Sequence, residues 1–364
     1  MLGFYALSAA PLSALGSVAF ALTAAGGAFG VTGQDAAFRV SRSSGAGAFA
    51  LTGEAAGLSA ARVLVASAGT FTVTGERAGG VRQASSAGGA FALTGEAARL
   101  ALSRASGATA YTMTGHAAAA QTVRVSSAGA FTLDGRAAGL VLQPTVFGFA
   151  GAFALTGQAV TFVATRTMLA GAGAFTMDGG AAGLGLSFTL PATAGAFTVT
   201  GAAAAAQYGY AAGAGAFTLT GHGAALESER VIEAAAGAVA LTGEAAGLSV
   251  GRVMPAEGGA FALTGEAVTL TRAVVLTAAA GAVVWTGQSA RLEEGLVMTA
   301  GAGAFTVTGA AAGLVRGRTL SAARGAFLMT GQAATLTATG TVRLRGRDGS
   351  GPLMTARDES EGLW

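Results

Sequence analysis

Residues 46–58 read Ala-Gly-Ala-Phe-Ala-Leu-Thr-Gly-Glu-Ala-Ala-Gly-Leu, and variants of this unit recur along nearly the whole chain of 364 residues. Each copy is counted here from the Gly that follows the Thr, which is Gly53 in this stretch and is called the anchor. The fifteen anchors are Gly33, Gly53, Gly75, Gly95, Gly115, Gly135, Gly157, Gly179, Gly201, Gly221, Gly243, Gly265, Gly287, Gly309 and Gly331. A repeat of this length is typical of arrays in which each unit packs against its neighbours.

The composition of the chain follows from the repeated unit. It contains 60 Gly, 52% hydrophobic residues and only 11% charged residues, with a net charge of +3. The mean hydropathy of +0.58 argues against disorder of the charged, weakly hydrophobic kind. Five Pro exclude collagen, and the absence of Cys excludes disulfides and thiolate metal sites.

Large and small residues alternate before each anchor. Phe stands four residues before it in twelve copies, Thr one before it in thirteen, and Leu five after it in ten. This period of two predicts strands with one packed face. The expected repeat core is represented by Phe49, Leu51, Leu58, Phe91, Leu93, Leu100, Phe153, Phe261, Leu263 and Leu270.

The spacing of the anchors also favours β-structure. Successive anchors are 20 residues apart five times, 22 apart nine times and never 21. A slip of one residue would turn every side chain of a strand to the opposite face, whereas a helix has no such parity. Asp134-Gly135 and Asp178-Gly179 are hairpin signals, and one residue added to each arm of a hairpin would preserve its pairing. A second turn is expected in the Ala/Ser/Gly cluster before each Phe.

The sequence therefore predicts an all-β fold, a tandem array of fifteen two-strand repeats of 20 or 22 residues. Two forms fit: an elongated antiparallel meander, or a β-solenoid with one coil per repeat. A leucine-rich-repeat-like βα unit is a third form. Gly four residues after the anchor disfavours its helix, because Gly destabilises a helix interior by about 1 kcal/mol. These glycines are Gly57, Gly139, Gly183, Gly247 and Gly313.

One face of such strands would carry Phe and Leu, and the other Ala, Thr, Ser and Gly. A lone sheet buries too little apolar surface, so the Phe/Leu face must curl onto itself or pack against identical chains. In the second case the chain would be a homo-oligomer, for which a trimer is one arrangement.

Three segments are expected. Residues 1–27 form an apolar docking or capping segment, residues 28–338 the β-repeat array, and residues 339–364 a charged cap or tail. Terminal repeats of an array need a polar cap, and either end could instead attach to another protein.

The chain offers one candidate binding feature and no catalytic one. Arg recurs nine residues after the anchor and could form a stripe that binds a polyanion, or a solvated edge that keeps sheets apart. The stripe comprises Arg42, Arg62, Arg104, Arg124, Arg166, Arg230, Arg252 and Arg318. His116 and His222 follow anchors and are interpreted as variable turn residues, and the glutamates at that position are too scattered for paired acid–base work. We expect no catalytic, cofactor or metal residues, no specific nucleic-acid partner and no enzymatic activity.

Tandem units such as 214–226 and 46–58, behind the apolar start 1–12, resemble the repeat-bearing fibre-like or minor structural proteins of tailed bacteriophages. The resemblance covers residues 28–338 and carries no functional residues across. It implies a non-catalytic virion or tail-associated scaffold on the virion surface or outside the cell, bound to other virion proteins through a terminal segment and able to contact host-surface glycans. The alternative is a bacterial surface adhesin or a self-assembling extracellular filament.

Overall fold

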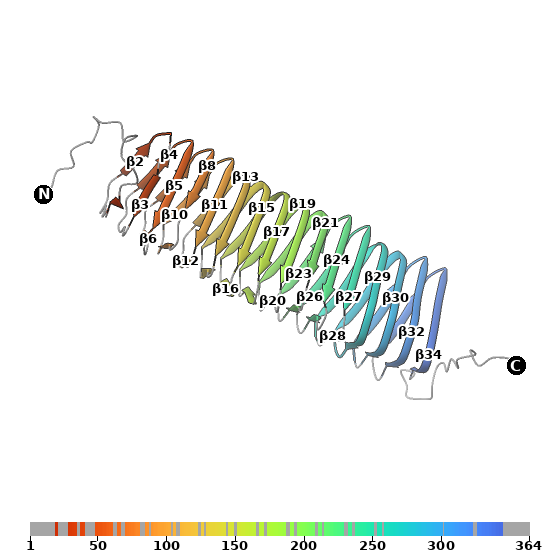
Figure 1. The fold of residues 1–364 in the computed structure, drawn as a ribbon. Helices are drawn as coiled ribbons and strands as arrows, with labels where there is room; N and C mark the ends of the chain where they lie inside the picture. The colour runs from red at the N-terminus through yellow and green to blue at the C-terminus, as the bar shows by residue number, and fades with distance from the viewer. Residues whose placement is uncertain are drawn as a thin grey trace.

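The computed structural model shows an elongated β-solenoid (Figure 1). The described residues are 19–20, 28–34, 37–40, 48–60, 64–66, 70–80, 84–86, 89–102, 105–106, 110–122, 125–126, 129–142, 145–148, 151–164, 167–170, 173–186, 190–192, 195–207, 210–212, 215–228, 232–234, 237–250, 253–256, 258–300, 302–322 and 326–344. Within these ranges every regular element is a strand. The all-β prediction is therefore confirmed, and the βα alternative is wrong for this part of the chain.

Strands that carry Phe before the anchor form one side of the solenoid, called the Phe sheet. Separate strands of this sheet are β2 (Ala28–Thr32), β4 (Ala48–Thr52), β7 (Thr70–Thr74), β10 (Ala90–Thr94), β23 (Ala216–Thr220), β26 (Ala238–Thr242), β31 (Ala304–Thr308) and β33 (Ala326–Thr330).

Strands that follow the anchor form the opposite side, called the Leu sheet. They include β1 (Ala19–Phe20), β3 (Ala37–Val40), β5 (Ala55–Ala60), β8 (Arg77–Gly80), β11 (Ala97–Leu102), β24 (Gly223–Ser228), β27 (Ala245–Val250), β32 (Ala311–Ala322) and β34 (Ala333–Leu344). Seven strands run through the anchor from one sheet into the other: β13 (Ala110–Thr122), β15 (Ala130–Leu142), β17 (Ala152–Ala164), β19 (Ala174–Leu186), β21 (Ala196–Gln207), β29 (Ala260–Ala278) and β30 (Ala282–Ala300).

A third set of short strands follows the Leu sheet, which the two-strand repeat did not predict. These are β6 (Leu64–Ala66), β9 (Ala84–Ser86), β12 (Ala105–Ser106), β14 (Val125–Ser126), β16 (Thr145–Gly148), β18 (Thr167–Ala170), β20 (Leu190–Ala192), β22 (Tyr210–Ala212), β25 (Ile232–Ala234) and β28 (Val253–Ala256). They too pair in parallel, for example Thr145 with Thr167.

All strand pairs among the described residues are parallel, so the antiparallel meander is not the observed architecture. Each residue pairs with its counterpart 20 or 22 positions later, as Phe29 does with Phe49 and Phe49 with Phe71. One irregularity occurs between β32 and β34, where Gly317 pairs with Ala338. The same register continues to Phe305 and Phe327 near the other end. The predicted solenoid is confirmed, because every coil places equivalent residues above one another.

The corner at the anchor is not a hairpin turn. The Gly53 N–H donates to the carbonyl oxygen of Thr74 at 3.0 Å, and the Arg77 N–H donates to that of Glu54 at 2.9 Å. The hydrogen-bonded ladder thus continues around the corner between coils, and the hairpin prediction is wrong. A chain that bends at each corner still alternates inward and outward side chains before and after the bend. Parallel coils therefore explain the even spacing of the anchors as well as hairpins would.

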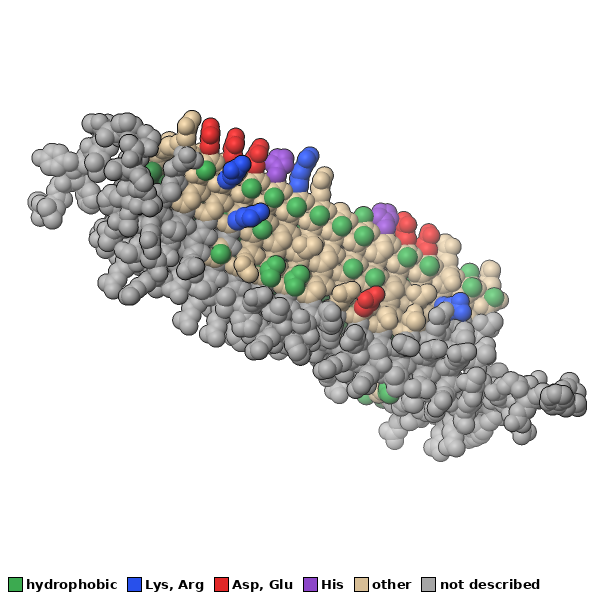
Figure 2. Space-filling model, in the orientation of Figure 1, with side chains coloured by type: hydrophobic (Ala, Val, Ile, Leu, Met, Phe, Trp, Pro, Cys, Tyr) green, Lys and Arg blue, Asp and Glu red, His purple; other side chains and the backbone are tan. Residues whose placement is uncertain are grey.

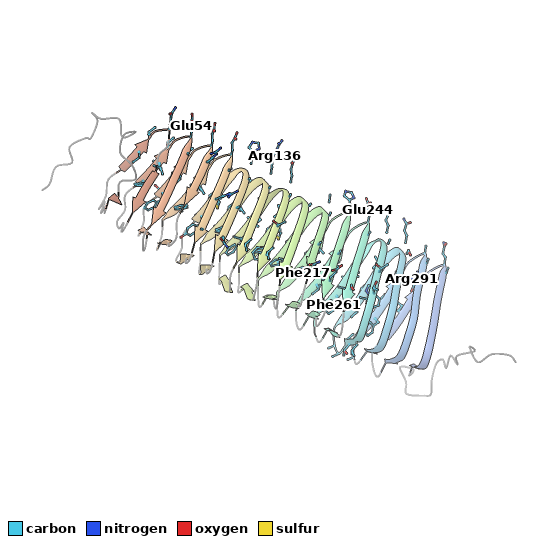
Figure 3. All side chains as sticks on the ribbon, in the orientation of Figure 1. Glu54, Arg136, Phe217, Glu244, Phe261 and Arg291 are labelled. Atoms are coloured by element: carbon cyan, nitrogen blue, oxygen red, sulfur yellow. The ribbon has the colours of Figure 1, made fainter. Side chains whose placement is uncertain are left out.

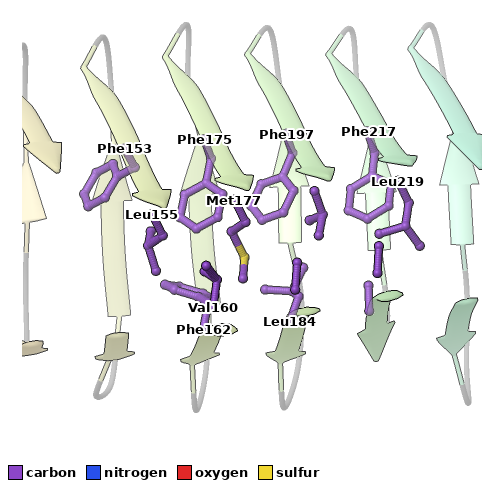
Figure 4. Packing of buried hydrophobic residues seen from close by; sticks show 14 of the residues in the cluster. Phe153, Leu155, Val160, Phe162, Phe175, Met177, Leu184, Phe197, Phe217 and Leu219 are labelled. Carbon is purple, nitrogen blue, oxygen red and sulfur yellow. The ribbon is translucent and has the colours of Figure 1, made fainter. Parts of the chain in front are cut away.

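The core lies between the two sheets (Figure 4). Phe rings from successive coils stack along it, with centroids 4.3 Å apart for Phe175 and Phe197. Across the core, Phe162 of the Leu sheet meets Phe175 of the Phe sheet edge-on at 5.0 Å. Both are buried, so the solenoid itself covers the apolar face that a single sheet would leave exposed.

Most of the predicted core residues are confirmed as buried. These are Phe49, Leu51, Phe91, Leu93, Phe153, Phe261, Leu263 and Leu270. Leu58 and Leu100 occupy equivalent register positions in β5 and β11, but their side chains lie outside the described part of the chain.

The predicted terminal segments fall mostly outside the described residues. At the N-terminal end Ala19 pairs with Arg39, and at the C-terminal end β34 extends to Leu344. The assignments of 1–27 and 339–364 as capping or docking segments therefore stay predictions.

Candidate functional site

The residue after each anchor projects from the corner, and together these residues form a line called the corner ridge (Figures 2 and 3). All members are exposed: Gln34, Glu54, Glu76, Glu96, His116, Arg136, Gln158, Gly180, Ala202, His222, Glu244, Glu266, Gln288, Ala310 and Gln332. The ridge arises because the bend at the anchor turns the side chain of the following residue outward in every coil.

Charges are grouped along the ridge. Three glutamates occupy consecutive coils near the N-terminal end. Each follows a Thr by two residues, and these Thr pair in order, Thr52 with Thr74 and Thr74 with Thr94. The expectation that these carboxylates are scattered is therefore wrong for Glu54, Glu76 and Glu96. They stand side by side in solvent, and no cluster of three or more His, Cys, Asp or Glu suited to a metal ion occurs in the described ranges.

The two histidines lie at separate places on the ridge, which agrees with their interpretation as variable corner residues. His222 Nδ1 lies 2.9 Å from Glu244 Oε1 of the next coil. The two side chains are 72% and 66% exposed, so this contact contributes little to stability. His116 lies five copies earlier, and the pair cannot share one ligand.

The predicted Arg stripe cannot be assembled from the described residues. Arg318 lies in β32, but its side chain is among those not described. The other members lie outside the described residues: Arg42, Arg62, Arg104, Arg124, Arg166, Arg230 and Arg252. Whether the stripe binds a polyanion stays a prediction.

The outer surfaces of both sheets are made mostly of small side chains, although the Leu sheet also exposes a few long polar ones, among them Arg99, Glu227 and Arg291. Below the ridge, the face seen in Figure 2 is mostly uncharged. On the Leu sheet the neighbouring Val141 and Val163 are exposed to 37% and 43%. The predicted Ala/Thr/Ser/Gly face therefore exists, but as the outside of a closed coil rather than one side of an open sheet.

On the outside of the Phe sheet, Thr directly before the anchor forms a row, called the threonine column, which Asp134 and Asp178 interrupt. Its longest run comprises Thr200, Thr220, Thr242, Thr264, Thr286, Thr308 and Thr330, each paired with the next. Thr stands before thirteen of the fifteen anchors in the sequence, which by itself indicates no function. The column could have been predicted, because Thr lies at an outward position of each strand and the even spacing keeps that position aligned from coil to coil.

Among the described residues no helix is long and apolar enough to cross a membrane. Comparison of the chain with protein-family models, curated proteins and solved structures found no match. Function is therefore argued from the geometry of the coil.

Proposed function

We propose that the chain is a non-catalytic structural protein that serves as a rigid repeat scaffold. The observation that carries this proposal is the unbroken register from Phe29 to Phe327, in which each coil is bonded to the next. Bending such a rod would break backbone hydrogen bonds and separate stacked rings along one side. The coil geometry therefore suits a spacer that holds two attached objects at a constant distance.

Each of the fifteen copies would form one coil in this proposal. Coils about 4.8 Å apart would give an array roughly 70 Å long. Identical outer surfaces, repeated at each coil, would also allow many weak contacts to act together, which raises avidity without any single strong site. The rod could contact a host-surface glycan or further copies of itself in this way.

The place of the scaffold rests on the sequence resemblance alone. A virion surface or tail-associated position, with a terminal segment bound to other virion proteins, follows from the likeness to phage repeat proteins. The alternative is a bacterial surface adhesin or extracellular filament. Immunogold labelling of purified particles and of the producing cells distinguishes them: label on particles supports the virion position, and label confined to the cell surface supports the alternative.

The scaffold itself is tested by excising whole copies. Removal of residues 157–242 joins Thr156 to Gly243 and deletes four copies while keeping the repeat phase. We expect a folded rod shorter by about 19 Å, which is four coil spacings. The maximum dimension from small-angle X-ray scattering and particle length in negative-stain images measure the change.

The matched control removes residues 157–243, one residue more. This excision places the strand after the junction out of phase, so inward and outward side chains exchange there. The control should lose β-structure by circular dichroism, whereas the phased excision should keep it. A phased variant with unchanged particle length would contradict the spacer.

A further inference from the structure

The threonine column belongs to a broader flat surface on the Phe sheet. In the run from Thr200 to Thr330, a second outward position stands two residues before each member of the column. It is occupied by Thr198, Thr218 and Thr306 in three coils, by Ala240 and Ala262 in two, and by Val284 and Leu328 in the other two. In the threonine column from Thr200 to Thr330 every side chain is partly or fully exposed. The result is a grid of hydroxyl and methyl groups held by a hydrogen-bonded backbone.

The grid has two regular repeats. Neighbouring coils place equivalent Thr side chains about 4.8 Å apart, and two residues along a strand span about 6.7 Å. Thr is β-branched and has few χ1 rotamers, so ordering its side chains on binding costs little entropy. Buried Phe197 and Leu219 directly beneath the surface further restrict the strands.

This grid carries no charge over its C-terminal half. The outward residues of the Phe sheet strands from Ala196 to Thr330 are Ala, Thr, Val and Leu only. In the middle of the molecule Asp134 and Asp178 replace Thr in the same column. The C-terminal half of the grid therefore offers no complementary charge to a charged polymer.

A flat neutral grid with hydroxyls at lattice spacing fits a partner that is itself a lattice of oxygen atoms. Crystalline polysaccharide is one such lattice, but its sugar rings are usually gripped by exposed aromatic rings. Every aromatic side chain whose burial is described is buried. Ordered water, by contrast, needs no aromatic contact and requires only regularly spaced hydroxyl and methyl groups. The distances between oxygen atoms in ice are comparable to the two repeat distances of the grid.

We infer that the threonine column and its neighbouring row form an ice-binding surface. Thr hydroxyls would join the water lattice by hydrogen bonds, and Thr and Ala methyls would hold the intervening waters in a cage-like layer. This function does not depend on the spacer role, because it requires only the grid on one sheet.

The test compares two substitutions in one strand. Thr264 lies in the middle of the column, whereas Thr269, also exposed in β29, faces outward on the Leu sheet. We expect the purified full chain to inhibit ice recrystallisation and to shape ice crystals in a nanolitre osmometer. Thr264→Tyr should abolish both effects, because a ring standing above the grid prevents flat contact, and Thr269→Tyr should retain them.

A second variant separates the surface from the fold. Thr264→Val keeps the branched shape and removes one hydroxyl, and it should weaken ice shaping less than Thr264→Tyr does. Circular dichroism and thermal unfolding must match the parent chain in all three variants. Absence of any effect of the parent chain on ice growth overturns the inference, as does equal loss in Thr264→Tyr and Thr269→Tyr. Retention of the chain on crystalline cellulose or chitin without an effect on ice also overturns it.

Discussion

At the residue scale, the anchor Gly is required by the distance between coils. A Cβ on Gly157 would overlap the carbonyl oxygen of Gly135 in the preceding coil, and Gly179, Gly201 and Gly265 meet the same kind of obstacle. None of these glycines has a positive φ that would itself demand Gly. The corner can bring two backbones this close only where no side chain stands between them.

Gly157→Ala should therefore destabilise the solenoid by roughly 1–3 kcal/mol, the usual cost of forcing atoms into a packed position. Gly183→Ala is the matched control, since a Cβ there meets no atom within 4 Å. The control should be neutral or stabilising by about 0.4–1 kcal/mol, because Ala restricts the unfolded chain. Thermal unfolding followed by circular dichroism measures both, and equal melting temperatures would contradict the steric argument.

At the element scale, each strand has to keep its inward and outward faces in phase with the strands above and below. In β17, Phe153 and Leu155 point into the core while Ala152 and Thr156 face solvent. Phe153 pairs with Phe131 on one side and with Phe175 on the other. The strand therefore has neighbours that impose its phase from both directions.

Insertion of one Ala between Ala154 and Leu155 should break this phase. Leu155 would move to the solvent side and Thr156 to the core, which buries a hydroxyl and exposes a large apolar side chain. The matched control inserts two residues after Arg104 and converts a 20-residue copy into one of the natural 22-residue length. Limited proteolysis should cut the first variant near the insertion and leave the second intact; resistance of the first would refute the parity argument.

At the scale of the whole molecule, every coil contacts only its neighbours, so stability accumulates along the rod instead of around one centre. Coils in the middle are covered on both sides. The ends are therefore expected to open more readily than the middle.

Native-state hydrogen exchange tests this gradient. Amides of β19 in the middle should exchange far more slowly than those of β2 and β33 near the two ends, because an interior coil opens only when two interfaces are lost. Mass spectrometry of peptides from timed exchange resolves the three strands. Uniform protection along the rod would indicate a single cooperative unit.

Much of the coil could be predicted from the sequence. The period, the β-structure, the inward Phe and Leu positions and the solenoid as one of two all-β arrangements follow from residue spacing. These features are local, because alternation along a strand decides which side chains share a face regardless of the neighbouring strand.

The choice between hairpins and parallel coils was decided only by the tertiary structure. Both arrangements use the same alternation and the same even spacing, so the pattern around Phe49 and Gly53 cannot separate them. The difference lies in the backbone partner of each strand, and that partner is set by stacking over 20 or 22 residues. The same stacking explains why Glu54, Glu76 and Glu96 meet on the corner ridge and why Thr200 to Thr330 form a row. The sequence by itself determined which side of each strand faces the core. Only the folded coil determined which residues of other copies lie beside a given residue, because copies that are distant in the sequence become neighbours through the pairing of their backbones.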